Sequence, residues 1–239
     1  MFGWFQKKHK LIDSGILQGK TDVHCHLLPG VDDGSPDVEH TMELLNFIEE
    51  VGFQSVWLTP HVMEDLDNST EKLSACFSTF AASYQGGCQL HLSAEYMLDA
   101  GFGKLLSSDM LKLGKNHLLV ETSYYSPPYD MDNMLKHIWE KGLKPLIAHP
   151  ERYYYMEEND YRRLKELGYE FQLNIMSLGG YYGKRAKFVA EKLMEWGLYD
   201  FVGTDLHHLH ISKDVIENMK LTHDQLQMLE QLLVNNENI

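Results

Sequence analysis

Residues 21–34 carry the stretch Thr-Asp-Val-His-Cys-His-Leu-Leu-Pro-Gly-Val-Asp-Asp-Gly. This pattern predicts a short strand ending in His24 and His26, then a tight Pro-Gly turn and a doubled aspartate. Because alternate side chains of a strand share a face, the two histidines point the same way and Cys25 points away. They form either half of a metal site or a pair of surface histidines near a strand end. The stretch alone does not separate these two interpretations.

The composition limits the class of protein and its partners. A chain of 239 residues, with 44% hydrophobic and 23% charged residues, suits a globular protein with one sizeable core. The formal net charge of −14 argues against nucleic acid or an anionic membrane as the main partner, since both attract basic surfaces. The same charge would repel a phosphorylated substrate unless metal cations supplied a positive field at the site.

The cysteines at positions 25, 76 and 88 are isolated and lack the spacing of a zinc knuckle. We therefore expect reduced thiols in a cytoplasmic protein, without a disulfide framework. No apolar run approaches the roughly 20 residues that a membrane span requires.

Residues 1–19 are expected to form an N-terminal arm beside a single domain of residues 20–239. The arm carries Phe2, Trp4 and Phe5 next to several lysines, so it permits peripheral membrane contact at most. An arm held loosely against the domain is the preferred interpretation.

Segments typical of strands and of helices alternate along the whole chain. Strands are predicted at 21–26, 54–59, 89–95, 117–121, 143–148, 169–175 and 199–204. Helices are predicted at 36–52, 69–84, 131–141, 160–167 and 184–196, with a looser helical region near 105–111 and one or two helices within 214–234. The alternation predicts parallel βαβ units closed into a barrel, although it also fits an open doubly wound sheet.

Metal-capable side chains stand at or just beyond the ends of six of the seven predicted strands. They are His24, His26, His61, Glu95, Glu121, His149, Asp205 and His207. In a barrel of alternating strands and helices, this rim is where the catalytic site lies. Together with Asp33 they make four carboxylates and five imidazoles, a mixture that suits Mn²⁺, Fe or Zn²⁺. So many ligands predict two or three ions, the arrangement that clamps the oxygens of a phosphoryl group during displacement by water.

A family resemblance emerges from longer motifs around these residues. The motifs are Asp22-Val23-His24-Cys25-His26, Leu28-Pro29-Gly30-Val31-Asp32-Asp33-Gly34, Thr59-Pro60-His61, Ala94-Glu95, Val120-Glu121, Ala148-His149-Pro150-Glu151-Arg152 and Thr204-Asp205-Leu206-His207. They resemble the polymerase-and-histidinol-phosphatase (PHP) domain. More narrowly, they resemble the bacterial manganese-dependent protein-tyrosine phosphatases of capsule and exopolysaccharide synthesis systems. The first twenty and last thirty residues lie outside these motifs.

The resemblance implies a distorted (β/α)7 TIM-like barrel that binds three divalent ions, Mn²⁺ foremost, with Fe or Zn²⁺ as alternatives. By this likeness, the first ion is held by His24, His26, Glu95 and Asp205, the second by Glu95, Glu121 and His149, and the third by Asp33, His61 and His207. The implied reaction is attack of a metal-bridging hydroxide on phosphotyrosine, with the tyrosine-rich tail of a capsule-system tyrosine autokinase as the implied substrate.

Two further residues are expected to take part in catalysis. Arg152 follows His149 by three residues, and its planar guanidinium suits two phosphate oxygens, although a surface salt bridge with Glu157 is the alternative. His207 is the second, and either it or His208 is placed to help the leaving group. Relatives often carry a further arginine a few residues beyond the Asp-x-His motif at 205–207. This chain has Ser212-Lys213 there.

Two tyrosine-rich runs follow predicted ligands, at 124–129 and 153–155. They either wall a cleft for an aromatic phospho-residue or serve ordinary loop packing. Two other functions stay open: a small-molecule phosphomonoesterase, such as a histidinol-phosphate phosphatase, and a non-catalytic metal-binding regulator. A nuclease role is disfavoured because the chain has no basic stripe.

Overall fold

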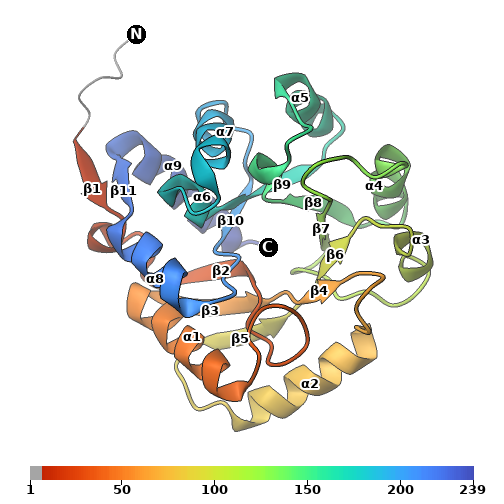
Figure 1. The fold of residues 1–239 in the computed structure, drawn as a ribbon, viewed down its shortest axis with the longest axis horizontal. Helices are drawn as coiled ribbons and strands as arrows, with labels where there is room; N and C mark the ends of the chain where they lie inside the picture. The colour runs from red at the N-terminus through yellow and green to blue at the C-terminus, as the bar shows by residue number, and fades with distance from the viewer. Residues whose placement is uncertain (1–6) are drawn as a thin grey trace.

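A computed structural model describes residues 7–239 as a ring of parallel strands surrounded by helices (Figure 1). The ring contains seven strand positions: β2 (Lys20–Cys25), β3 (Phe53–Leu58) continued by β4 (His61–Val62), β5 (Gln89–Leu92) continued by β6 (Glu95–Met97), β7 (His117–Glu121), β8 (Lys144–Ala148), β9 (Glu170–Asn174) and β10 (Phe201–Gly203). Since β3 pairs with β5 and β4 pairs with β6, both in parallel, each pair of short strands is one interrupted barrel strand.

The ring closes between its first and last strands. The hydrogen-bonded order is β10-β9-β8-β7-β6-β4 in one sheet and β2-β3-β5 in the other. Cys25 and Leu206 form a parallel bridge, and the His26 amide donates to the Leu206 carbonyl at 2.9 Å. The Asp205 amide likewise donates to the His24 carbonyl at 2.7 Å. The predicted seven-stranded barrel is therefore confirmed, and the open-sheet alternative is wrong.

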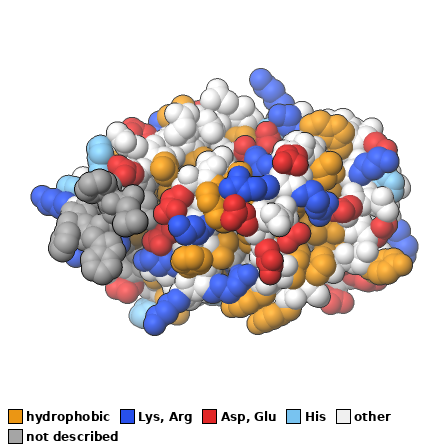
Figure 2. Space-filling view, turned by 90° about the horizontal axis from the view of Figure 1, so that it is seen from above, with side chains coloured by type: hydrophobic (Ala, Val, Ile, Leu, Met, Phe, Trp, Pro, Cys, Tyr) orange, Lys and Arg blue, Asp and Glu red, His pale blue; other side chains and the backbone are white. Residues whose placement is uncertain are grey.

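Helices cover the outside of the ring. They are α1 (Val38–Val51), α2 (Thr70–Ser83), α3 (Phe102–Leu105), α4 (Met131–Glu140), α5 (Glu158–Glu166), α6 (Ile175–Gly179), α7 (Gly183–Glu195), α8 (Leu209–Asn218) and α9 (His223–Asn236). α1 begins where the Asp37 side chain accepts from the His40 amide, and it ends at Gly52 in the left-handed region. On the face shown in Figure 2, acidic, basic and apolar side chains are interspersed, so negative charge is spread over that face.

Two segments differ from prediction for local reasons, and the tail resolves a prediction of one or two helices. The loose region near 105–111 contributes only the single turn α3, which ends at Leu105. The strand expected to reach residue 175 stops at Asn174, whose side chain accepts from the Met176 amide and starts α6. The tail holds two helices separated by the short strand β11 (Lys220–Thr222).

The N-terminal segment packs onto the domain. Strand β1 (Lys8–Lys10) pairs antiparallel with β11, and Leu11 and Leu17 are buried in the main core. The division of the chain at residue 20 stays a prediction. Phe2, Trp4 and Phe5 lie outside the described residues. Within residues 7–239, no helix combines the length and apolar character needed to cross a membrane.

The two ends of the barrel differ in chemistry. Val23, Leu119, Leu146 and Phe201 belong to a small buried cluster, against which Ile239 packs. Figure 1 shows the C-terminus within the ring of strands, as this contact requires. Apolar side chains therefore fill one end of the barrel, and the polar residues described below gather at the carboxyl ends of the strands.

Replacing Asn236 with alanine is expected to cost about 3 kcal/mol of unfolding free energy. Its side chain is 1% exposed and donates to the carbonyls of Thr21 and Val202 at 2.8 and 2.7 Å. It also accepts from the Val202 amide at 3.1 Å. The variant leaves three buried backbone groups unpaired at the β2–β10 closure.

Urea unfolding measures this loss. Asn238→Ala is the matched control, because Asn238 is exposed and bonds only within its own turn, so we expect a change below about 0.5 kcal/mol. Equal stability of the two variants would contradict a role for Asn236 in barrel closure.

Candidate metal centre

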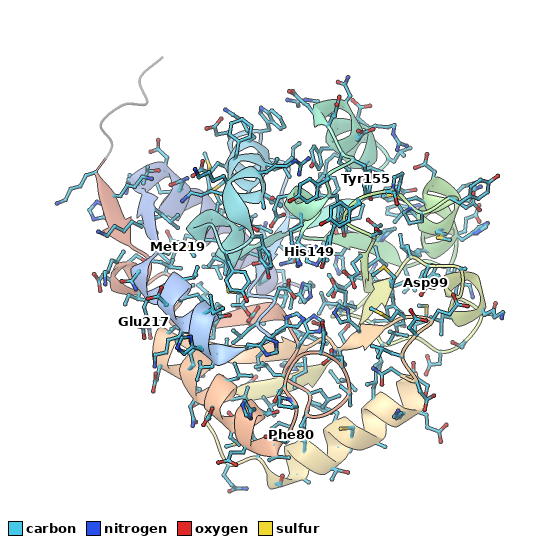
Figure 3. The ribbon with its side chains drawn as sticks, in the orientation of Figure 1. Phe80, Asp99, His149, Tyr155, Glu217 and Met219 are labelled. Carbon is cyan, nitrogen blue, oxygen red and sulfur yellow. The ribbon has the colours of Figure 1, made fainter. Side chains whose placement is uncertain are left out.

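The carboxyl ends of the barrel strands bring together all nine predicted ligands. Figure 3 shows His149 near the middle of the ring. The donor atoms form three overlapping groups, each spanning no more than 4.8 Å: His24, Glu95, His149 and Asp205; His61, Glu95 and Glu121; and His26, Asp33, His61 and His207. The prediction that strand-end residues converge is therefore met by the geometry, while metal binding itself stays a prediction.

Four buried donors lie at the spacing expected around one ion. The Nε2 atoms of His24 and His26 are 3.2 Å apart. Both lie 3.3–3.4 Å from Glu95 Oε2 and 3.4–3.5 Å from Asp205 Oδ1. Ligands at about 2.1 Å in a tetrahedron are separated by about 3.4 Å. This is the set that the resemblance implied for the first ion.

Glu95 connects this set to a second one. Its Oε1 lies 3.0 Å from His149 Nε2, and its Oε2 lies 3.2 Å from His61 Nδ1. The same His61 nitrogen is 3.0 Å from Glu121 Oε1. The resemblance assigned His61 to the third ion only, whereas its Nδ1 faces Glu95 and Glu121 and only its Nε2 faces Asp33, at 3.5 Å. His61 is thus placed to contact two ions, one through each ring nitrogen.

The third set is the most open of the three. Asp33 Oδ1 lies 3.5 Å from His61 Nε2 and 3.6 Å from His207 Nε2, and the Asp33 side chain is 75% exposed. Glu95 and Asp205, by contrast, are nearly inaccessible. Among the three groups, solvent therefore reaches the one with Asp33 and His207 most easily.

Unsatisfied atoms indicate that these groups suit cations. Among the buried atoms of the described residues that make no acceptable hydrogen bond are two that face other candidate ligands, His61 Nδ1 and Glu95 Oε2. His61 Nδ1 and Glu95 Oε2 have neighbours at 3.0–3.4 Å, so the angles, and not the distances, prevent bonding. Donors oriented toward a shared point instead of toward each other are typical of ligands to a metal.

The electrostatics of the cluster also favour positive charge. Burial alone would raise the pKa of Glu95, but the neighbouring His24, His149 and His26 outweigh it and hold that pKa well below its usual range. Burial opposes protonation of His26, yet Asp205, Asp32 and Glu95 raise the pKa of its imidazole well above the ordinary value. The buried carboxylates therefore create a field that divalent cations would satisfy.

Two supporting side chains escaped the sequence analysis as functional residues. Asp32 accepts from His26 Nδ1 at 2.8 Å and from the His61 amide at 3.0 Å, so it orients both ligands. Gln172 on β9 lies 3.0 Å from His24 Nδ1 through its Oε1. Such partners set the tautomer and ring orientation of ligating histidines. The Asp32-Asp33 pair in the sequence could have indicated a role for Asp32. A single glutamine within a strand, such as Gln172, gives no such indication.

Backbone strain coincides with the cluster. Within residues 7–239, His149 (φ 34°) and Asp205 (φ 53°) are the non-glycine residues with positive φ. Such conformations cost free energy and persist where the surroundings enforce them, commonly at functional sites. His149 follows β8 directly and Asp205 stands two residues after β10, and both side chains enter the cluster.

Arg152 adds a cation to one side of the cluster. It ends the short 3-10 turn Pro150–Arg152, and its Nη1 donates to Asp205 Oδ2 at 2.7 Å. Its Nη2 donates to the Tyr124 hydroxyl at 2.7 Å, and the guanidinium lies between the rings of Tyr124 and Tyr182. The alternative of a surface salt bridge with Glu157 is wrong, since Arg152 pairs with a buried ligand residue.

Lys213 does not replace the missing second arginine. Its Nζ lies 3.4 Å from Glu50 Oε2 and 3.7 Å from Glu217 Oε1, on the outer surface of α8. His208 contacts His207 edge-on, with ring centroids 6.2 Å apart. Neither side chain joins the three donor groups.

Comparison with known proteins is consistent with this geometry. The family model described as "Capsular polysaccharide synthesis, CpsB/CapC" matches residues 20–236. The chain belongs to the CpsB/CapC family. The match reaches residue 236, well beyond the motifs that the sequence analysis recognised, which ended near residue 210.

Individual CpsB/CapC relatives are distant but extensive matches. The tyrosine-protein phosphatase YwqE of Bacillus subtilis is 28% identical over 202 residues, covering 79% of this chain and 77% of the relative. The tyrosine-protein phosphatase CpsB of Streptococcus pneumoniae is also 28% identical, covering 79% and 83%. A crystal structure from work on these two proteins, described as unique metal-dependent tyrosine phosphatases, superposes with a TM-score of 0.70 at 23% identity, covering 90% of this chain and 94% of the other.

The tyrosine runs of this CpsB/CapC protein divide between packing and surface. Tyr153 is fully buried and stacks on Tyr155. Tyr125 and Tyr154 are exposed and stack on each other with ring centroids 5.3 Å apart. Loop packing is therefore confirmed for Tyr153 and Tyr155, while a cleft for an aromatic phospho-residue stays a prediction. Tyr125 and Tyr154 line a cavity of about 180 Å³ that Arg152 also borders.

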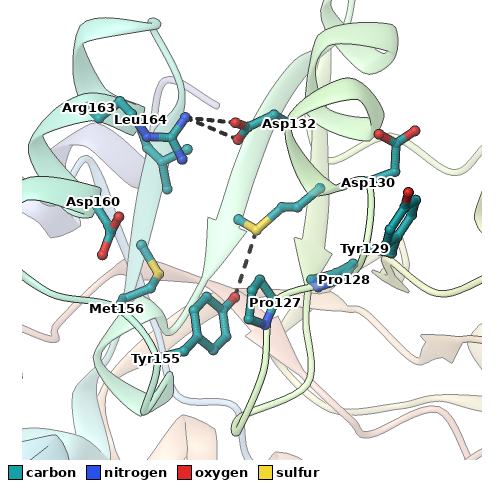
Figure 4. A pocket seen from close by; sticks show the side chains of 11 residues that line it. Pro127, Pro128, Tyr129, Asp130, Asp132, Tyr155, Met156, Asp160, Arg163 and Leu164 are labelled. Carbon is teal, nitrogen blue, oxygen red and sulfur yellow. Dashed lines mark hydrogen bonds and ion pairs between the residues drawn. The ribbon is translucent and has the colours of Figure 1, made fainter.

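A wider cleft, of about 610 Å³, lies between the loop 127–130 with the first turn of α4 on one side and α5 on the other (Figure 4). Arg163 and Asp132 form an ion pair across it, and the Tyr155 hydroxyl contacts Met131 Sδ. None of the nine candidate ligands lines this cleft. It is therefore separate from the candidate metal centre.

Proposed function

We propose that this CpsB/CapC protein is a metal-dependent protein-tyrosine phosphatase. The observation that carries the proposal is the convergence of nine histidine and carboxylate side chains beside the guanidinium of Arg152. The substrate is a phosphotyrosine protein of a capsule or exopolysaccharide system. We infer that the phosphotyrosines lie in the tyrosine-rich tail of a tyrosine autokinase. The cofactor is Mn²⁺, with three ions held by the three donor groups.

The side chains have separate tasks in this reaction. Bound cations would supply Lewis-acid stabilisation of the phosphoryl oxygens and a water of lowered pKa. Arg152 holds phosphate oxygens, and Asp205, Tyr124 and Tyr182 keep its guanidinium in place. The leaving phenoxide has a parent pKa near 10, so a strong general acid is unnecessary.

The hydrogen bonding of His207 assigns its role. Its Nδ1 lies 2.9 Å from the Asp205 carbonyl oxygen, which can only accept, so the proton sits on Nδ1. Its Nε2, directed at Asp33, is then free to bind a cation. We therefore place His207 in catalysis as a ligand and not as the proton donor.

Mn²⁺-dependent phosphate release from a tyrosine phosphopeptide tests the proposal. The assay runs beside histidinol phosphate and a phosphoserine peptide, with Zn²⁺ and Fe²⁺ as alternative metals. We expect activity on phosphotyrosine with Mn²⁺, and its loss in His149→Ala, which removes a donor 3.0 Å from Glu95.

Other outcomes would redirect the assignment. Preference for histidinol phosphate would make the protein a small-molecule phosphomonoesterase. Metal binding without activity on any of the three substrates would favour a non-catalytic regulator.

A further inference from the structure

Arg185 differs from the other arginines of the chain in having no acidic partner. The sequence contains four arginines, and three of them form ion pairs: Arg152 with Asp205, Arg162 with Glu158, and Arg163 with Asp132. Within residues 7–239, no carboxylate oxygen lies within 4.0 Å of Arg185. In a protein with a net charge of −14, an unpaired guanidinium requires an explanation.

Its position is nevertheless well defined. Nη2 of Arg185 donates to the backbone carbonyls of Tyr153 and Tyr154, at 3.2 Å each. The guanidinium carbon lies 4.6 Å from the centre of the Tyr154 ring. Its Nε and Nη1 make no hydrogen bond to any described residue. The side chain is therefore held in place with donors still available, as a binding group should be.

Arg185 borders the 180 Å³ cavity that also contains Arg152. Tyr125, Tyr154 and Tyr182 form its aromatic walls. Through Arg152 and through the Tyr182 hydroxyl, 3.1 Å from Asp205 Oδ2, the cavity adjoins the metal centre directly. A group bound there would lie next to a phosphate held by Arg152.

Within the described residues, Arg185 gives the cavity a positive charge that no lining carboxylate pairs with. Glu151 lines it, but its Oε1 accepts from Ser177 and the Asn174 amide, and its Oε2 accepts from Tyr199. This carboxylate is fully buried and engaged away from the guanidinium groups. Arg185 also lies in the first turn of α7, which has no acidic residue and adds the partial positive charge of a helix start.

Resting on the proposed phosphatase function, we propose that this cavity binds the carboxylate of an aspartate or glutamate flanking the substrate phosphotyrosine. The cavity is small, about 180 Å³, which suits a short acidic side chain. Arg152 serves the phosphate, and either Nη1 or Nε of Arg185 donates to the second anion. Arg185 is thus a specificity residue of the site.

Steady-state kinetics with paired peptides tests this. One phosphotyrosine peptide carries glutamate on both flanks, and its partner carries glutamine; free phosphotyrosine reports hydrolysis without flanks. For the wild type we expect kcat/KM about tenfold higher with the glutamate peptide, mainly through KM. In Arg185→Gln, kcat/KM for the glutamate peptide divided by kcat/KM for the glutamine peptide should fall towards one. Arg185→Lys should retain part of this preference.

Arg162→Gln is the matched control, because Arg162 pairs with Glu158 on the surface of α5, and its ratio should equal that of the wild type. Equal rates on both peptides with the wild type would overturn the inference. So would a loss in Arg185→Gln as large on free phosphotyrosine as on the glutamate peptide, since the arginine would then act on the shared site.

A third peptide, carrying a second phosphotyrosine, tests the alternative anion. If it exceeded the glutamate peptide and lost that advantage in Arg185→Gln, the carboxylate assignment would be wrong. If the wild type hydrolysed the small ester histidinol phosphate but no phosphotyrosine compound, the proposed function would fail, and this inference with it.

Discussion

Glu95→Gln is expected to lower kcat for phosphotyrosine hydrolysis at least a thousandfold. The Glu95 carboxylate lies 3.0–3.4 Å from donor nitrogens of His24, His26, His61 and His149, so it belongs to more than one ligand set. An amide keeps the shape but removes the charge that two cations would share. A loss of several kcal/mol of transition-state stabilisation is typical where metal ions stabilise a phosphoryl group.

The measurement combines phosphate release with metal content of the purified protein. We expect bound metal to fall together with activity, while the far-UV circular dichroism stays that of the wild type. Glu170→Gln is the matched control, because Glu170 is a partly buried carboxylate on β9 that pairs with His117 and Lys144. Its activity should stay within about threefold of the wild type. Full metal content and activity in Glu95→Gln would exclude Glu95 as a bridging ligand.

Arg152→Lys is expected to lower kcat/KM by about a hundredfold or more, although the charge is retained. Arginine holds Asp205 with one nitrogen and the Tyr124 hydroxyl with another, and its plane lies between two tyrosine rings. A lysine ammonium is a point charge that cannot reproduce this arrangement or bind two phosphate oxygens side by side.

Kinetics on the phosphotyrosine peptide and on free phosphotyrosine measure this loss. Both substrates should be affected equally, which separates Arg152 from Arg185. Arg163→Lys is the control, since Arg163 pairs with Asp132 at the distant cleft and carries the same substitution. Near-normal activity of Arg152→Lys would mean that positive charge alone suffices at this position.

The sequence predicted the barrel strands and the candidate ligands well, for a physical reason. Apolar runs bounded by glycine and proline are local signals, and the end of each run can be located without knowing its neighbours. A barrel places all those ends on one rim, so Glu121 Oε2 and His149 Nε2 lie 3.9 Å apart although the residues are 28 positions apart. The short turn α6 escaped prediction because its start depends on one side-chain cap at Asn174.

The supporting residues could not be predicted in the same way. Gln172 occupies an ordinary strand position, and its contact with His24 depends on how two strands far apart in sequence are arranged across the barrel. Lys213 stands where relatives often carry a further arginine, yet it lies with Glu50 on the outer surface. A position in sequence does not specify which side of a helix faces the site.

The amino-acid sequence by itself determined the seven strand positions, the metal-capable residues at their ends and the resemblance to a phosphatase family, because these follow from short-range patterns. Only the tertiary structure decided which candidate ligands share a donor group. His61, for example, faces two groups, one through each ring nitrogen. The tertiary structure also decided that Arg152 pairs with Asp205, 53 residues away, while Arg185 beside it has no acidic partner among the described residues. These outcomes depend on ring closure between β2 and β10, which brings distant charges within a few ångströms and so sets which of them neutralise one another.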